Sequence, residues 1–395
     1  MCIVKSKKTN LLVILLLLFI LIILVACESS EQEFSSPPQS ETGEQSGIID
    51  DYANYIEEVM EEDGIPGAAV AIIEGDDIIF IEGYGFQDVE KGTPVTADTL
   101  FHIGSINKSM TSMMIATLID EGLFEWDTPA VNIYPEFELS SPESTNAVTI
   151  RHLLSMQSGI PDDAEDDFDI DNAAAEDVLD FIADTPLQGN PGDEFSYSNL
   201  SASVAGYLGV LANGEMGDGL YDGYAALLKK NVLDPIGMKT AVVRVSDAQA
   251  SPHYGKSYIL DQDGQPVEAE VEDFDGDPLA PSGTVKANVR EMALYVSTHL
   301  NHGQAPNGNR VVSEQNIAET WKPSLENYGM GWEVITYEGI DIITHEGSYD
   351  NYLSTIGFIP EFDIGFVILT NAEEASERMI KDSPSFLVDL LLDNE

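Results

Sequence analysis

Strand-like segments lie near both ends of this chain, with helix-like segments between them, and this order constrains the fold more than any other feature. Residues 68–73 and 78–84 are rich in aliphatic and aromatic residues and are joined by Glu-Gly-Asp-Asp, which predicts a β-hairpin. Further strand-like segments precede the C-terminus at residues 332–336, 340–345, 352–359 and 364–370. Helical periodicity dominates between the two groups, at residues 149–154, 173–183, 200–211, 221–232 and 288–300.

The order of these segments predicts an α+β fold. An antiparallel β-sheet built from both chain ends is expected to be flanked by helices and to carry a helix-rich insert. An opening helix is expected at residues 50–62, and a terminal helix is expected after Pro384. Hydrophobic residues make up 43% of the chain, which is enough for the core of one large domain or of two closely packed ones.

The N-terminus predicts export. Residues 11–26 are sixteen apolar residues in a row after a lysine-containing start, so residues 1–26 are predicted to be a signal peptide. The run ends in Leu-Val-Ala-Cys, which resembles a bacterial lipobox with Cys27 as the lipidated residue. The protein is therefore expected on the outer face of the cytoplasmic membrane, anchored through this lipid. An uncleaved signal anchor is the alternative.

A tether is predicted between the anchor and the folded domain. Residues 28–47 contain one aromatic and no aliphatic residue, so residues 27–47 are expected to be a lipid anchor with a disordered tether. The folded domain is then expected to span residues 48–395. Cys2 and Cys27 are the only cysteines, so a mature chain that starts at Cys27 has no internal disulfide and no cysteine-based metal site.

The charge of the chain excludes one class of partner. With 70 Asp and Glu against 17 Lys and Arg, the formal net charge is −53, and such a surface repels nucleic acid. The acidic runs at 167–172 and 273–277 lack the ligand spacing of a calcium loop, and the histidines lack the spacing of a metal cluster. No metal and no cofactor are expected.

Ser105 and Lys108 are the candidate nucleophile and base. Ser105 precedes an apolar helical segment, and Lys108 follows one turn later on the same helix face. A partly desolvated lysine can accept the serine proton, and the helix dipole favours the negative charge that develops. An N-capping serine beside a surface lysine is the alternative, but no other lysine in the chain has a serine three residues before it.

Around these residues the sequence resembles the serine β-lactamase and penicillin-binding-protein superfamily, in its class C β-lactamase-like branch. The resemblance covers residues 48–371 and is carried by Ser-x-x-Lys together with segments 149–160, 328–332 and 360–371. It implies a β-lactamase/transpeptidase-like fold and hydrolysis through an acyl-serine. Met156 stands where the family commonly has histidine, and this difference is expected to affect packing only.

The resemblance implies a second motif, Tyr-x-Asn. Three matches exist, and the one at 197–199 is favoured because it follows Pro-Gly and precedes a small-residue helix. Tyr197 would share the general-base role with Lys108, as a phenolate favoured by the nearby ammonium. Asn199 would bind the substrate amide and orient Lys108.

A third motif is Lys-Thr-Gly or His-x-Gly in the family, and residues 345–347 are favoured among three matches because they lie between two strands. His345 would line the cleft and, like Tyr197, could assist the water that releases the acyl group. Glu346 and Gly347 would adjoin the substrate, and the backbone N–H groups of Ser105 and Ser348 would form the oxyanion hole. Glu346 would also repel a substrate carboxylate, and no lysine is present in this motif to attract one.

Together these features predict an exported serine hydrolase that acts on a small-molecule or peptide-like ester or amide, of the esterase or D-amino-acid amidase/peptidase type. One alternative is a penicillin-binding D-alanyl-D-alanine carboxypeptidase or a class C-like β-lactamase. An alternative of another class is a receptor for cell-wall fragments or β-lactams that does not turn over. Apart from the acyl substrate, the membrane is the only partner expected, through the lipid anchor.

Overall fold

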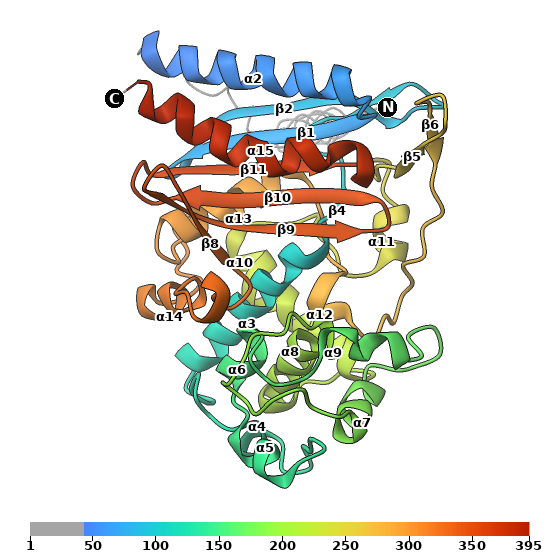
Figure 1. Ribbon diagram of the computed structural model, residues 1–395, viewed down its shortest axis with the longest axis vertical. Coiled ribbons are helices and arrows are strands. Elements are labelled where there is room, and N and C mark those ends of the chain that lie inside the picture. The colour runs from blue at the N-terminus through green and yellow to red at the C-terminus, as the bar shows by residue number, and fades with distance from the viewer. Residues whose placement is uncertain (1–42, 395) are drawn as a thin grey trace, which may run out of the picture. The chain divides into compact units, whose positions relative to one another are not determined.

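A computed structural model describes residues 43–394 of the chain (Figure 1). The predicted signal peptide, the predicted lipidation site Cys27 and most of the predicted tether lie outside these residues. The first described element is the helix α2 (Gly43–Asp63), which includes the predicted helix at 50–62. Since α2 begins at Gly43, five residues assigned to the tether belong to this helix.

The centre of the fold is a seven-stranded sheet in the order β3-β2-β1-β11-β10-β9-β8, and every neighbouring pair is antiparallel. The two chain ends meet where β1 pairs with β11, in a register that runs from Ala68 opposite Thr370 to Glu74 opposite Ile364. The predicted sheet from both chain ends is therefore confirmed. The strands are β1 (Gly67–Glu74), β2 (Asp77–Asp88), β3 (Thr93–Pro94), β8 (Glu333–Tyr337), β9 (Ile340–Tyr349), β10 (Tyr352–Ile359) and β11 (Ile364–Thr370).

Helices cover both faces of this sheet (Figure 1). On one face, α2 and α15 (Glu373–Leu392) share an apolar cluster in which Tyr52, Ile56 and Leu387 are fully buried or nearly so. The helix α15 begins eleven residues before Pro384 and contains it. The predicted helix, which was expected to begin after this proline, was therefore too short. On the other face, α13 (Val289–Leu300) packs on β1 and β11.

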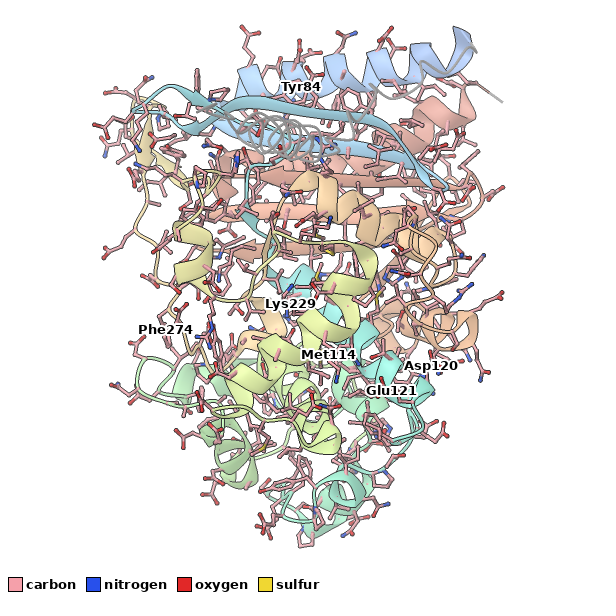
Figure 2. All side chains as sticks on the ribbon, turned by 180° about the vertical axis from the view of Figure 1, so that it is seen from behind. Tyr84, Met114, Asp120, Glu121, Lys229 and Phe274 are labelled. Atoms are coloured by element: carbon pink, nitrogen blue, oxygen red, sulfur yellow. The ribbon has the colours of Figure 1, made fainter. Side chains whose placement is uncertain are left out.

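The insert is helical, as predicted, and is centred on α3 (Asn107–Asp120). All residues of α3 from Asn107 to Ile119 are buried. The first exposed residues are Asp120, at the end of the helix, and Glu121, just after it, and Figure 2 marks both. The other helices of the described chain are α4 (Ala130–Ile133), α5 (Pro142–Ala147), α6 (Ile150–Leu154), α7 (Asp177–Asp184), α8 (Asn199–Asn213), α9 (Leu220–Leu228), α10 (Asp234–Ile236), α11 (Val245–Gln249), α12 (Ala280–Gly283) and α14 (Glu314–Thr320).

Two short strand pairs were not predicted. β4 (Phe101–His102) pairs with β7 (Lys286–Ala287), and this pair fixes the backbone just before Ser105. β5 (Tyr258–Leu260) pairs with β6 (Pro266–Glu268) in a separate hairpin. Within residues 43–394, no helix combines the length and the apolar character needed to cross a membrane.

Candidate active site

Ser105 lies in a 3-10 turn, Gly104–Ile106, that leads directly into α3. The turn is pressed against β9: a Cβ atom added to Gly104, whose φ is +52°, would lie 2.6 Å from both the backbone N and the backbone O of Ser348. A Cβ added to Gly347 would lie 3.0 Å from the backbone N of Ser105. The backbone amides of Ser105 and Ser348 are thus brought into one region by glycines that permit this close approach.

Lys108 contacts Ser105 as predicted. Its Nζ donates to Ser105 Oγ at 2.9 Å, to Asn199 Oδ1 at 2.6 Å and to the backbone O of Ser282 at 3.1 Å. The residue is 1% exposed, and burial lowers the pKa of its ammonium to about 7 even though nearby acids raise it. A lysine with this pKa has a large fraction of neutral amine near pH 7 and can take a proton from Ser105.

Tyr197 immediately precedes Ser198, whose side chain caps the first turn of α8. Its ring lies over the Lys108 ammonium, with Nζ 4.7 Å from the ring centroid. Burial raises the pKa of the Tyr197 phenol, although a hydrogen bond with Ser105 lowers it. The expectation of a phenolate favoured by the ammonium is therefore wrong for the resting protein, because the cost of desolvating the phenolate dominates.

Asn199 is the first residue of α8 and holds two groups at once. Its Oδ1 accepts from Lys108, and its Nδ2 donates to Glu165 Oε1 at 3.0 Å. Glu165 belongs to the 3-10 turn Asp162–Asp167 and was missed in the sequence, where it is one acid in an acidic stretch. No local signal separates it from its neighbours, since only the fold brings it to Asn199.

His345 is 3% exposed and does not belong to the residues that line the cleft beside Ser105. Its Nδ1 lies 2.5 Å from the backbone O of Glu346, which can only accept, so Nδ1 carries the proton and Nε2 accepts from Tyr328 OH at 3.0 Å. Burial lowers the pKa of His345 to about 3. With both nitrogens occupied, His345 has no nitrogen free to bind water, and the expectation that it assists a water molecule does not fit this geometry.

Glu346 also lies elsewhere than predicted. Side chains alternate along β9, so Glu346 is on the face opposite His345, and it is exposed. Burial has the largest effect on the pKa of Glu346 and raises it. The neighbouring charges belong to α15: Lys381 lowers this pKa and Glu377 raises it. The prediction that Glu346 borders the substrate is thus corrected. Met156 is buried beside Tyr328 and Tyr197.

A cavity of about 290 Å³ opens beside Ser105. No Lys, Arg or His occurs among the described residues that line it, whereas three acids do. The acidic character expected from Glu346 is therefore present, but it comes from other residues. The lining consists of Ser105, Glu165, Asp166, Ile170, Asn199, Asp277, Leu279, Ser282, Gly283, Ser348 and Tyr349.

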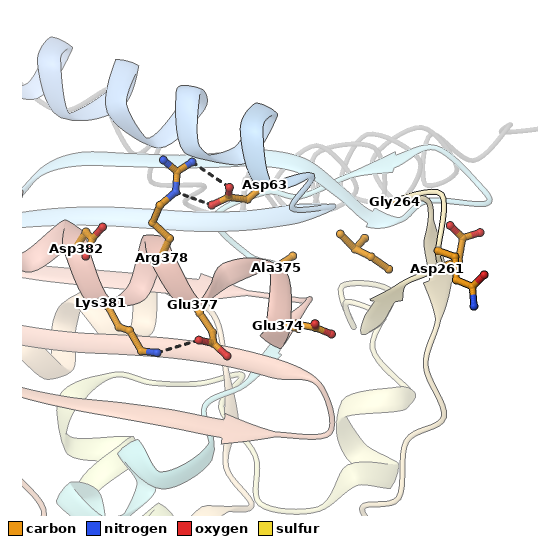
Figure 3. A pocket seen from close by; sticks show the side chains of 11 residues that line it. Asp63, Asp261, Gly264, Glu374, Ala375, Glu377, Arg378, Lys381 and Asp382 are labelled. Atoms are coloured by element: carbon orange, nitrogen blue, oxygen red, sulfur yellow. Dashed lines mark hydrogen bonds and ion pairs between the residues drawn. The ribbon is translucent and has the colours of Figure 1, made fainter.

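A larger cavity, of about 800 Å³, lies at α15 and the β5–β6 hairpin (Figure 3). Its basic residues are already paired: Arg378 binds Asp63, and Lys381 binds Glu377 at 2.9 Å. The two cavities share no lining residue, and neither Ser105 nor Lys108 borders this one. The smaller cavity is therefore the candidate active site.

Two curated relatives show what this chain is similar to. It is 26% identical over 349 residues to unguisins hydrolase ungD' of Aspergillus campestris, covering 84% of this chain and 63% of that protein. It is 27% identical over 331 residues to protein flp of Staphylococcus aureus, covering 82% and 64%. The chain thus spans less than two thirds of either curated relative.

Among solved structures, the chain resembles the octameric penicillin-binding protein homologue from Pyrococcus abyssi, with a TM-score of 0.73, 25% identity, and coverage of 87% of this chain and 77% of that one. This similarity confirms the predicted β-lactamase/transpeptidase-like fold. The sequence model of the Beta-lactamase family matches residues 52–385, which is most of the chain. The protein belongs to the Beta-lactamase family, within the predicted superfamily of serine β-lactamases and penicillin-binding proteins.

Proposed function

We propose that this protein is an exported serine hydrolase that cleaves an ester or amide through an acyl-serine intermediate. The observation that carries the proposal is the contact of 2.9 Å between Ser105 Oγ and the buried Lys108 Nζ beside a cavity. The name of one relative, a hydrolase, agrees with it.

The first chemical step transfers the acyl group to Ser105. Neutral Lys108 takes the hydroxyl proton as Oγ attacks the carbonyl carbon, and the backbone N–H groups of Ser105 and Ser348 stabilise the oxyanion. The tetrahedral intermediate collapses when the leaving group departs with a proton. The Tyr197 hydroxyl, which lies near enough to Ser105 for the two to interact, is placed to relay that proton from Lys108.

The second step returns the enzyme to its starting state. A water molecule loses a proton to the Lys108–Tyr197 pair and attacks the acyl carbonyl, and Ser105 leaves with a proton. Because the cavity is lined by acids and by no cationic residue of the described chain, neutral or amine-bearing acyl donors of the esterase or D-amino-acid amidase/peptidase type suit it better than carboxylates.

The test compares the wild type with Ser105→Ala on p-nitrophenyl acetate, following p-nitrophenol release and intact mass. Repeated turnover that requires Ser105 supports the proposal, whereas equal activity in Ser105→Ala contradicts it. A stable Ser105 adduct without release would instead indicate the receptor that does not turn over.

A penicillin-recognising function is the second candidate, because the similar solved structure is described as a penicillin-binding protein homologue. Benzylpenicillin carries a carboxylate, and the acidic cavity disfavours it. Incubation with benzylpenicillin decides between the two: we expect no Ser105-dependent adduct by intact mass, and an adduct would favour the carboxypeptidase or β-lactamase alternative.

We also propose that the protein is attached to the outer face of the cytoplasmic membrane through a lipid on Cys27. The support is the apolar run that ends in Leu-Val-Ala-Cys. Cys27→Ala should move the protein from the membrane fraction to the soluble fraction, and a variant that stays in the membrane fraction would favour the uncleaved signal anchor.

A further inference from the structure

The side-chain amide of Asn199 separates two opposite charges. Its oxygen accepts from Lys108 at 2.6 Å, and its nitrogen donates to Glu165 Oε1 at 3.0 Å. A carboxylate accepts hydrogen bonds and does not donate them, so Glu165 determines which end of the amide faces it. The end that faces Lys108 is therefore the carbonyl oxygen.

This orientation matters for the proton transfer from Ser105. Lys108 Nζ has three close neighbours, of which Asn199 Oδ1 and the backbone O of Ser282 can only accept. When Lys108 is a neutral amine it has two N–H bonds and one lone pair. The two acceptors take the two N–H bonds, and the lone pair is left for the hydroxyl proton of Ser105. If the amide were reversed, its NH2 group would compete with Ser105 for that lone pair.

We infer that Glu165 is a positioning residue, which locks the amide of Asn199 and, against the effect of burial, favours the charged form of Lys108 from the far side of that amide. This role rests on the proposed function, because it concerns the base of that reaction. Nothing in the motif Ser-x-x-Lys or in Tyr-x-Asn requires an acid at this place, and the sequence of η2 (Asp162–Asp167) gives Glu165 no distinction from the acids around it.

The charges around Lys108 favour this role for Glu165 over the other acids. Among the charged groups that raise the pKa of Lys108, Glu165 has the largest effect and Asp162 the second. The other titratable groups nearby are Tyr197 and His345, which burial keeps neutral.

The surroundings of Glu165 disfavour its charged form. Burial raises its pKa, as do Asp162 and Asp166, while Asn199 and Lys108 lower it. Its Oε2 is buried without a hydrogen-bond partner among the described residues. Such a carboxylate costs free energy of folding, which is typical of a group kept for a reason other than stability.

The test measures kcat/KM for p-nitrophenyl acetate between pH 5 and 9 in the full-length protein. Glu165→Gln removes the charge but keeps an oxygen that can accept from Asn199, whereas Glu165→Ala removes both. Asp163→Asn is the matched control, because Asp163 is an exposed acid of the same turn that does not line the cavity. Thermal melting of each variant verifies folding.

The expected wild-type profile rises with a midpoint near pH 7, the pKa of Lys108. Loss of the carboxylate on the far side of the Asn199 amide should move this midpoint about one pH unit lower in Glu165→Gln and in Glu165→Ala. The plateau of Glu165→Ala should in addition fall about tenfold below that of Glu165→Gln, since the amide is free to turn. Asp163→Asn should keep the wild-type midpoint.

If the pH midpoint of Glu165→Gln equals that of the wild type, Glu165 does not influence the charge of Lys108. If the plateau values of kcat/KM are equal in Glu165→Gln and Glu165→Ala, Glu165 does not fix the orientation of the Asn199 amide. If the Glu165 variants do not fold, Asp162→Asn tests the charge effect, with a smaller shift in the same direction expected and no shift contradicting it. A wild-type protein without Ser105-dependent turnover would contradict the proposed function itself, which is a different result from either of these.

Discussion

The Lys108 ammonium lies against the face of the Tyr197 ring, with Nζ 4.7 Å from the ring centroid. Nζ makes its hydrogen bonds to Ser105, Asn199 and the backbone O of Ser282. Burial acts oppositely on the two groups: it lowers the pKa of the lysine to about 7 and raises the pKa of the phenol. Both side chains are thereby held near their neutral forms, so the amine of Lys108 is the group ready to accept the serine proton.

The first prediction concerns the pH dependence of acylation. The active form has neutral Lys108, which is populated above its pKa of about 7, so kcat/KM should rise through pH 7 and level off near pH 8. Stopped-flow measurement with a p-nitrophenyl ester gives the pH at which kcat/KM rises. A rise near pH 10, the ordinary range of lysine, would mean that burial does not lower the pKa of Lys108 in solution.

The second prediction separates the ring of Tyr197 from its hydroxyl. Tyr197→Phe keeps the ring over Lys108 but removes the hydroxyl that interacts with Ser105, so kcat/KM should fall about a hundredfold or more while the melting temperature stays close to that of the wild type.

The control is Tyr295→Phe, which removes another buried hydroxyl that contacts α3, through Ser109 Oγ at 2.9 Å. This variant should lose about 1 kcal/mol of stability and keep most of its activity. Similar activity losses in the two variants would show that packing, and not proton transfer, explains the effect.

The third prediction tests the close approach at the oxyanion hole. Gly104→Ala places a Cβ 2.6 Å from the backbone of Ser348 at a position with φ of +52°, so both the turn and β9 must shift. We expect a large loss of kcat with a lower melting temperature.

Gly92→Ala is the matched control for this substitution. Gly92 also has a positive φ, of +65°, but a Cβ there meets nothing within 4 Å. This control should cost only about 1–2 kcal/mol of stability and should leave kcat unchanged. Equal kcat in the two glycine variants would contradict the prediction that catalysis depends on the close approach of Gly104 to Ser348.

The sequence predicted the sheet well because hydrophobic periodicity and turn residues are local signals. The segments at 352–359 and 364–370 coincide with β10 and β11, and both are buried throughout. Prediction failed where tertiary contacts override local signals. Pro384 was expected to start the last helix, but packing of α15 on α2 and the sheet carries the helix through it. The two-residue strands β4 and β7 have too few residues for any periodicity.

In the site, residues that belong to short motifs could be predicted, and residues joined only by the fold could not. Ser105, Lys108 and Asn199 meet as expected. Glu165 reaches Asn199 from a turn 34 residues away in sequence, and no pattern marks it. The prediction that Glu346 borders the substrate was wrong because neighbouring side chains of a strand point to opposite faces, and along β9 Glu346 points away from His345.

A buried ion pair behind the active site gives the last prediction. Lys286 of β7 contacts Asp273 through Nζ and Oδ2, and both side chains are almost fully buried. Burial raises the pKa of Asp273 to about 6 and lowers the pKa of Lys286, so each ion depends on the other for its charge. Lys286 lies opposite His102 in the strand pair that leads to Ser105.

Lys286→Met should therefore lower the free energy of unfolding by about 3–5 kcal/mol, because it leaves the carboxyl group of Asp273 buried without its ion partner. The double variant Lys286→Met/Asp273→Leu should recover most of this loss, since neither charge then remains. Lys229→Met, which breaks an exposed pair with Asp234, should change stability by less than about 1 kcal/mol. Urea unfolding of the four proteins measures all of these values. If the double variant were as unstable as the single one, the loss would come from the volume or shape of the lysine and not from its charge.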